Sequence, residues 1–268
     1  MSTLTASEYA QISRKLIAQF DEHIGRDSLR LETAGNRAAL KAGVVLGLAV
    51  HVHKLSRVVL DLLEGDTPSS LVVPTLRTCF EASLTAHWVA QSVDAAAALF
   101  NEEFRQRRAI QQTMTTAQSS STREAAVRVA HADSPDSVTS STVQARHFEQ
   151  RLKDFEGGGP DIYVLFRRLS TFSHAGASLI DLYHDNAPDD SEHLFTLRLD
   201  PKPPFPPEFC TSMIGCCLVW AGAAVCLVQQ DADAWHFELR AAAAELDTLA
   251  DIPLSADARR RQNLPTAP

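Results

Sequence analysis

The sequence predicts an all-α protein, a helical bundle of about seven or eight helices with one short extended arm. Apolar residues recur every three or four positions along most of the chain, which is the period of an amphipathic helix. Serine, aspartate, proline and glycine separate these stretches where helices begin and end. Only one short segment alternates apolar and polar residues like a half-buried strand. With 45% hydrophobic residues, the chain can build a sizeable core.

Four long helices are predicted in the first half of the chain. Ser7 and Asp94 are typical N-cap residues for the first and the fourth helix, and Gly25 is typical of a helix end. Pro74 is compatible with the third helix because it falls within the first turns. The second helix is apolar on all sides over 44–50, so we expect it to be buried. The predicted bounds are 7–25, 36–64, 69–92 and 94–118.

The second half contains the less regular parts. The segment 119–142 is rich in Ser, Thr, Ala and Asp and has no aromatic residue, so we expect a flexible insert or a weak helix around 123–131. A short helix over 143–156 should end at three glycines. Pro160 suits the first turn of a helix that continues to Tyr183. Two more helices are expected over 207–230 and 231–250.

The extended arm is the segment 194–200. Phe195, Leu197 and Leu199 alternate there with polar residues. No partner strand is evident, so the arm should pack on the helices. Three consecutive arginines mark the segment after the last helix. We therefore predict one helical domain over 1–254, with its insert at 119–142, and a disordered basic tail over 255–268.

Charge and cysteine usage exclude several classes of protein. The net charge is −8, which argues against non-specific nucleic-acid binding, so no DNA partner is expected. None of the five cysteines forms a CxxC pair, so we expect free core thiols and no zinc site. The first residues lack a basic and an apolar signal segment, which predicts a cytoplasmic protein.

The uncharged stretch from Phe209 to Val228 is long enough to span a bilayer. A central bundle helix without membrane contact is the favoured interpretation, and a single-helix membrane anchor is the alternative.

Two predicted helices each carry a stripe of polar side chains on otherwise apolar surroundings. In the helix 69–92 the stripe consists of Arg77, Glu81, Thr85 and Trp88. In the helix 160–183 it consists of Tyr163, Arg167, Ser170, His174 and Asp181. Burying such groups without partners is costly, so we expect the two stripes to face each other in one internal polar cluster.

Two interpretations of this cluster stay open. It is either a satisfied network that fixes the helix register, or a pocket in which Arg77 and Arg167 bind an anion while Glu81 and His174 exchange protons. His174 is the best candidate for chemistry because the ordinary histidine pKa is near neutrality. The predicted site therefore has His174 and Arg167 as catalytic residues and Arg77, Glu81, Tyr163 and Ser170 as binding residues. The leading hypothesis is a cytoplasmic helical protein that binds a small or anionic ligand through this cluster.

No metal or cofactor is expected. Asp181-x2-His184 and Asp233-x2-His236 resemble the carboxylate-x2-His pairs of helical di-iron bundles. Both pairs fall at predicted helix ends, and bridging glutamates at a matching depth are not evident. We therefore interpret these residues as polar helix ends.

The stripes also carry a resemblance. Together, 75–88 and 163–174 resemble a bacterial all-helical family known only as a domain of unknown function, whose members have an Arg-x3-Glu helix and a Tyr…Ser…His helix. The resemblance covers roughly residues 40 to 185. It implies an all-helical fold and an importance of both stripes, and it brings no activity with it.

A second, weaker resemblance is to HEPN-type helical ribonucleases, whose signature is an arginine followed by four to six residues and then a histidine. Arg167-x6-His174 and Arg168-x5-His174 fit, and only Arg167 shares a helix face with His174. The Asn, Asp or His that usually follows the arginine is missing, since Arg168 or Leu169 stands there. This resemblance implies a metal-independent ribonuclease acting on RNA, with His174 as acid and base and Arg167 stabilising the phosphate charge.

Overall fold

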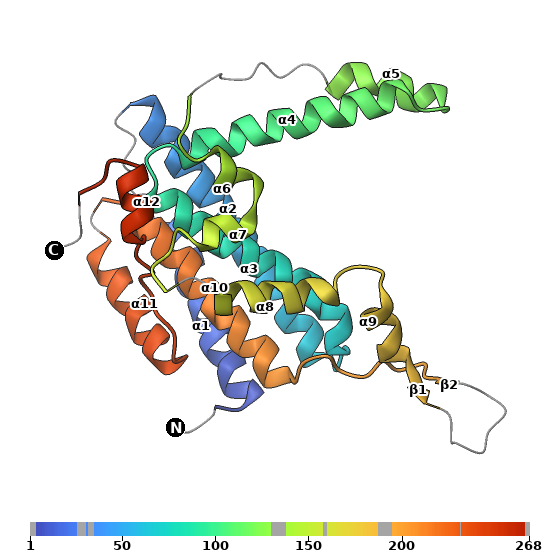
Figure 1. The fold of residues 1–268 in the computed structure, drawn as a ribbon. Coiled ribbons are helices and arrows are strands. Elements are labelled where there is room, and N and C mark those ends of the chain that lie inside the picture. The colour runs from blue at the N-terminus through green and yellow to red at the C-terminus, as the bar shows by residue number, and fades with distance from the viewer. Residues whose placement is uncertain are drawn as a thin grey trace.

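The computed structural model describes residues 4–25, 31, 35–129, 138–157, 160–186, 195–230 and 232–265. These residues confirm the all-α class (Figure 1). The α-helices are α1 (Ala6–Gly25), α2 (Asn36–Glu64), α3 (Ser69–Gln91), α4 (Ala95–Thr115), α5 (Ser120–Val129), α6 (Thr142–Arg146), α7 (Phe148–Leu152), α8 (Pro160–Thr171), α9 (Ala177–Ile180), α10 (Pro207–Cys226), α11 (Asp233–Glu245) and α12 (Ala256–Arg261). A 3₁₀-helix, η1 (Asp181–Tyr183), and two strands, β1 (His184–Asn186) and β2 (Phe195–Leu197), complete the described elements.

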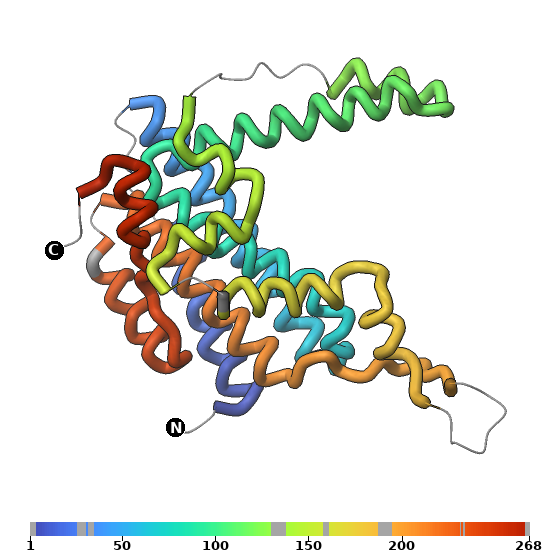
Figure 2. The backbone as a smooth tube through the Cα atoms, viewed as in Figure 1, coloured from blue at the N-terminus to red at the C-terminus, as the bar shows by residue number. Residues whose placement is uncertain are grey.

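Helix α10 is the centre of the bundle. It packs against α1, α2, α3 and α11 (Figures 1 and 2). Two glycines allow the close approach of α11. A Cβ added to Gly215 would lie 2.9 Å from the Leu246 side chain, and one added to Gly222 would lie 2.9 Å from the Leu239 side chain. A larger residue at either position would therefore require the facing leucine side chain to move.

Two helices of the described part, α2 and α10, are long and apolar enough to cross a membrane by length and composition. In α10, 89% of the most apolar stretch is buried inside the protein. In α2 the corresponding share is 39%, and within 44–50 only Val45 and Ala49 are buried, so the expected burial of this stretch on all sides is wrong. Helix α10 thus packs as the central helix expected over 207–230.

The predicted helix over 143–156 is two short helices, α6 and α7. The backbone of His147 between them is extended, with φ −125° and ψ 113°. Asp94 precedes α4 as expected, but its carboxylate does not cap that helix. It accepts hydrogen bonds from the Ser141 hydroxyl at 2.6 Å and from the backbone N–H of Ser140. Asp94 therefore connects the start of α4 to the segment that leads into α6.

The segment expected to be a flexible insert contains helix α5. It packs against α4 as a helical hairpin that extends from the bundle (Figure 1). Arg123 donates hydrogen bonds of 2.6 Å to the carbonyls of Ala117 and Gln118, just beyond the end of α4, and Ala126 is buried. Of the two expectations for this segment, the weak helix around 123–131 agrees better with the observed helix α5 than the flexible insert does. Residues 130–137 lie outside the described part.

The segment expected to be a disordered basic tail forms helix α12. The Ser255 hydroxyl caps it by accepting a hydrogen bond from the Ala258 N–H at 3.3 Å. Beyond the helix, the Gln262 side chain donates to the Ser92 hydroxyl at 3.1 Å and accepts from the Val93 N–H at 2.9 Å. Residues 256–262 therefore close over the junction between α3 and α4, and only 266–268 of the predicted tail lie outside the described part.

The extended arm does not pack on the helices as expected. Strand β2 pairs with β1 in an antiparallel ribbon that extends from the bundle (Figure 1). Phe195 stacks on His184 with ring centroids 4.4 Å apart. Leu197 and Leu199 are 62% and 89% exposed. The alternation of this segment therefore does not mark a buried face, and its apolar side chains are not part of the core.

Candidate functional site

The second polar stripe is interrupted because helix α8 ends at Thr171. Three hydroxyls near that end, those of Ser170, Thr171 and Ser173, donate to the carbonyls four residues earlier at 2.8 to 2.9 Å. Such bonds compete with the helix, and Ser and Thr are weak helix formers. The expected single helix over 160–183 is thus corrected: His174 and Asp181 lie beyond α8.

The two stripes contact each other through one arginine of the first stripe. Arg77 of α3 donates from Nε to the Ser170 hydroxyl of α8 at 2.8 Å. Its Nη2 lies 3.4 Å from a carboxylate oxygen of Glu81, one turn further along α3. The guanidinium also lies over the ring of Phe166, 4.7 Å from the centroid. The Arg77 and Glu81 side chains are 24% and 32% exposed, so this contact lies at the edge of the core.

A second arginine beneath this contact was missed in the sequence. Arg151 of α7 is 9% exposed. It donates to the hydroxyl of Thr85 at 2.7 Å and to the carbonyls of Gln144 and Ala145 at 2.9 and 3.1 Å. Burial lowers the pKa of Arg151, and the nearby carboxylate of Glu81 opposes that shift. In the sequence Arg151 stands among surface charges of a predicted amphipathic helix, so no pattern distinguishes it.

The remaining predicted residues lie apart from this network. Arg167 is exposed, and Tyr163, four residues earlier on α8, raises its pKa. The pKa of nearby Glu149 is lowered mainly by Lys153, at 2.7 Å. His174 is exposed and has no hydrogen-bond or ionic partner within the described residues. Arg167 and His174 are therefore not brought together as the predicted catalytic pair.

Several other residues named from the sequence lie in the core or form an ion pair. The Trp88 indole is buried and donates to Asp154 at 2.9 Å. All five cysteines are free and buried, as expected. His236 pairs with Asp251 at 2.8 Å, while the side chain of Asp233 lies outside the described part. Within the described residues, no group of three His, Cys, Asp or Glu side chains is placed to hold a metal ion.

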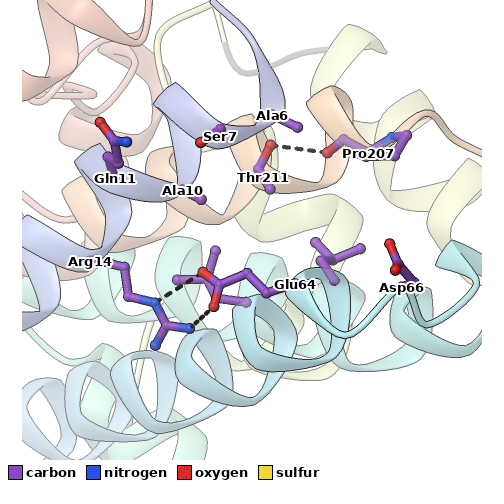
Figure 3. A pocket seen from close by; sticks show the side chains of 11 residues that line it. Ala6, Ser7, Ala10, Gln11, Arg14, Glu64, Asp66, Pro207 and Thr211 are labelled. Carbon is purple, nitrogen blue, oxygen red and sulfur yellow. Dashed lines mark hydrogen bonds and ion pairs between the residues drawn. The ribbon is translucent and has the colours of Figure 1, made fainter.

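A cavity of about 570 Å³ lies elsewhere, between the N-terminal half of α1, the end of α2 and the start of α10 (Figure 3). Its apolar lining residues are Ala6, Ala10, Leu60, Leu63 and Pro207. Its polar and charged lining residues are Ser7, Gln11, Arg14, Glu64, Asp66 and Thr211. None of them belongs to the predicted site. Sequence reasoning missed the cavity because its walls come from three helices, and no short motif marks them.

An ion-pair network holds α1 to α2 at the edge of this cavity. Arg14 donates to both carboxylate oxygens of Glu64 at 3.3 and 2.8 Å, and to Asp61 at 2.5 Å. These two carboxylates raise the pKa of Arg14, and Glu64 makes the larger contribution. Asp66 follows in a left-handed backbone conformation with φ 57°. It is exposed and has no side-chain partner within the described residues.

Comparisons with known protein families, with curated proteins and with solved structures find no match for this chain.

Arg77→Met tests how much the contact between α3 and α8 contributes to the stability of the protein. We expect the free energy of unfolding to fall by about 1.5 kcal/mol, because Glu81 loses its partner and Phe166 loses the guanidinium. Urea unfolding at neutral pH measures the change. Arg107→Met is the matched control, since it breaks an exposed pair with Glu103 four residues away on α4 and should change stability little. Equal losses in both variants would contradict a specific role of Arg77.

Proposed function

We propose that the protein binds a small, largely apolar molecule in the cavity between α1, α2 and α10. The observation that carries this proposal is the cavity itself, with a volume of about 570 Å³ and a lining that combines apolar side chains, of which Ala10 and Leu60 are buried, with polar ones. Sites for small molecules have volumes of about 300 to 1,000 Å³ and combine apolar walls with a few polar groups. The cavity has both properties.

The walls of the cavity are pre-formed. Leu60 is fully buried and Ala10 is 9% exposed, so the inner wall belongs to the hydrophobic core. The small side chains of Ala6 and Ala10 on α1 leave the volume between the helices unfilled. The contacts of Arg14 with Asp61 and Glu64 hold α1 at its distance from α2. A pre-formed site needs little ordering when a ligand binds.

The polar network between α3, α7 and α8 has a different role in this proposal. Arg77, Glu81 and Ser170 have one another as partners, which supports the interpretation as a network that fixes helix packing. The ribonuclease hypothesis needs Arg167 beside His174, and it gains no support from the described residues, where His174 has no ionic or hydrogen-bond partner. The proposal also keeps the expectation of a cytoplasmic protein, and it treats α10 as a bundle helix, which the burial of its apolar stretch supports.

The test uses N-phenyl-1-naphthylamine, a neutral fluorescent probe with an apolar body. We expect saturable binding of one probe per chain, with increased fluorescence. Ala6→Trp should weaken this binding at least about tenfold, equivalent to 1.4 kcal/mol, because the indole occupies the cavity next to Pro207. Ala18→Trp is the matched control, since Ala18 is an exposed residue of the same helix outside the cavity lining.

Thermal unfolding verifies that both tryptophan variants fold. Saturable binding that is lost in Ala6→Trp and kept in Ala18→Trp supports the cavity as the site. An absence of saturable binding, or an equal loss in both variants, would overturn the proposal.

A further inference from the structure

The mouth of the cavity carries an excess of negative charge. Arg14, Glu64 and Asp66 are the charged residues of the lining. The guanidinium of Arg14 is already bonded to Glu64 and to Asp61. Asp66 adds a further carboxylate that no side chain within the described residues neutralises. Two carboxylates thus contact the guanidinium and a third lies apart from it at the cavity, so these four groups carry a net charge of −2.

The dipoles of the helices that end or begin at the cavity do not cancel this excess of negative charge. Helix α2 ends there with no basic residue in its last turn, so the negative end of its dipole adds to the carboxylates. Helices α1 and α10 begin at the cavity with the positive ends of their dipoles. Each has a glutamate in its first turn, Glu8 and Glu208, which opposes that positive end. Glu8 also accepts the backbone N–H of Thr5 at 2.8 Å.

We infer that the ligand is an amphiphilic cation, with an apolar chain or ring system inside the cavity and a protonated amine or quaternary ammonium group beside Glu64 and Asp66. This inference rests on the proposed function and specifies its ligand class. Ala6, Ala10, Leu60, Leu63 and Pro207 accommodate the apolar part. A cation at the mouth is attracted by the unneutralised carboxylates, whereas an anion there would have to compete with them for Arg14.

Three ligands with the same chain length separate charge from apolar contact. Decyltrimethylammonium, decanol and decanoate are each titrated against the protein loaded with N-phenyl-1-naphthylamine. We expect the cation to bind about tenfold more tightly than decanol, and decanoate to bind most weakly. Added NaCl should reduce the affinity of the cation and leave that of decanol unchanged, because salt screens exposed charges.

Asp66→Asn tests the unpaired carboxylate. Asparagine tolerates the left-handed backbone of this position, so the turn after α2 is kept. We expect about a fivefold loss of affinity for decyltrimethylammonium, equivalent to about 1 kcal/mol, and no change for decanol. Asp247→Asn is the matched control, since Asp247 is also exposed and left-handed, with φ 52°, and lies after α11 outside the cavity lining.

The outcomes separate this inference from the proposed function. A decanoate affinity equal to or above that of the cation, or an Asp66→Asn variant that behaves like Asp247→Asn, would overturn the inference. If decanol still displaces the probe and Ala6→Trp still blocks it, the proposed function stands. If none of the three ligands displaces the probe, both fall.

Discussion

Asp154→Ala should lower the free energy of unfolding by about 3 kcal/mol, the loss typical of breaking a buried ion pair. Asp154 is 3% exposed. One of its carboxylate oxygens accepts the Trp88 indole N–H at 2.9 Å and the Arg261 guanidinium at 2.5 Å. Without the carboxylate, a buried indole N–H and a partly buried guanidinium both lose their partner. Urea unfolding at neutral pH measures this loss.

Asp257→Ala is the control for that measurement. Asp257 pairs with Arg260 on the same short helix, and both side chains are largely exposed. Its loss should leave the unfolding midpoint nearly unchanged. A similar effect of the two substitutions would show that Asp154 has no special role in joining α12 to the rest of the bundle.

Acid should destabilise the protein by about 3 kcal/mol between pH 6.5 and pH 4 through one buried histidine. His53 of α2 is 3% exposed, stacks on Phe20 with ring centroids 3.5 Å apart, and hydrogen-bonds the carbonyl of Ala49 through Nδ1. Burial lowers its pKa from 6.5 to about 4. Below pH 6.5 the unfolded chain therefore binds a proton that the folded protein excludes. Stability is complete above pH 6.5 and falls as the pH approaches 4.

The measurement is the free energy of unfolding at a series of pH values. His53→Leu should flatten the curve between pH 6.5 and 4, whatever it does to stability at neutral pH. Burial also lowers the pKa of His87, so some slope remains in the variant. His51→Leu is the control, because His51 is exposed two residues away on the same helix. An unchanged slope in His53→Leu would exclude His53 as the titrating group.

Sequence patterns predict the long helices well because those helices are decided locally. The second helix begins and ends as predicted, at Asn36 and Glu64, since a long apolar repeat stands between glycines. The pairing of Arg77 with Glu81 follows from their spacing of four residues on one helix. In both cases the determining residues are neighbours in the chain.

The end of α8 shows how a local pattern misleads. The apolar period continues beyond it through Phe172, Leu179 and Ile180, which predicts one long helix. The hydroxyls of Ser170 and Ser173 form competing bonds to the backbone, and that competition is not visible in an apolar repeat. His174 was assigned to the site on the basis of a helix that stops before it.

Contacts between distant parts of the chain could not be predicted from one sequence. The cavity results from small residues on α1 opposite the ends of α2 and α10. Likewise, the three consecutive arginines near the end of the chain predict a disordered tail when the partner of Arg261 is unknown. In the structure they lie in α12, and Arg261 pairs with the carboxylate of Asp154.

The pairing of Asp154 with Arg261 also sets an order of events in the cell. The two residues are 107 positions apart. At roughly 5 to 20 residues per second, Arg261 is synthesised about 5 to 20 seconds after Asp154. During that interval the carboxylate lacks the Arg261 guanidinium, and the end of α3 is without its cover. The bundle can therefore reach its final packing only after translation has passed α12.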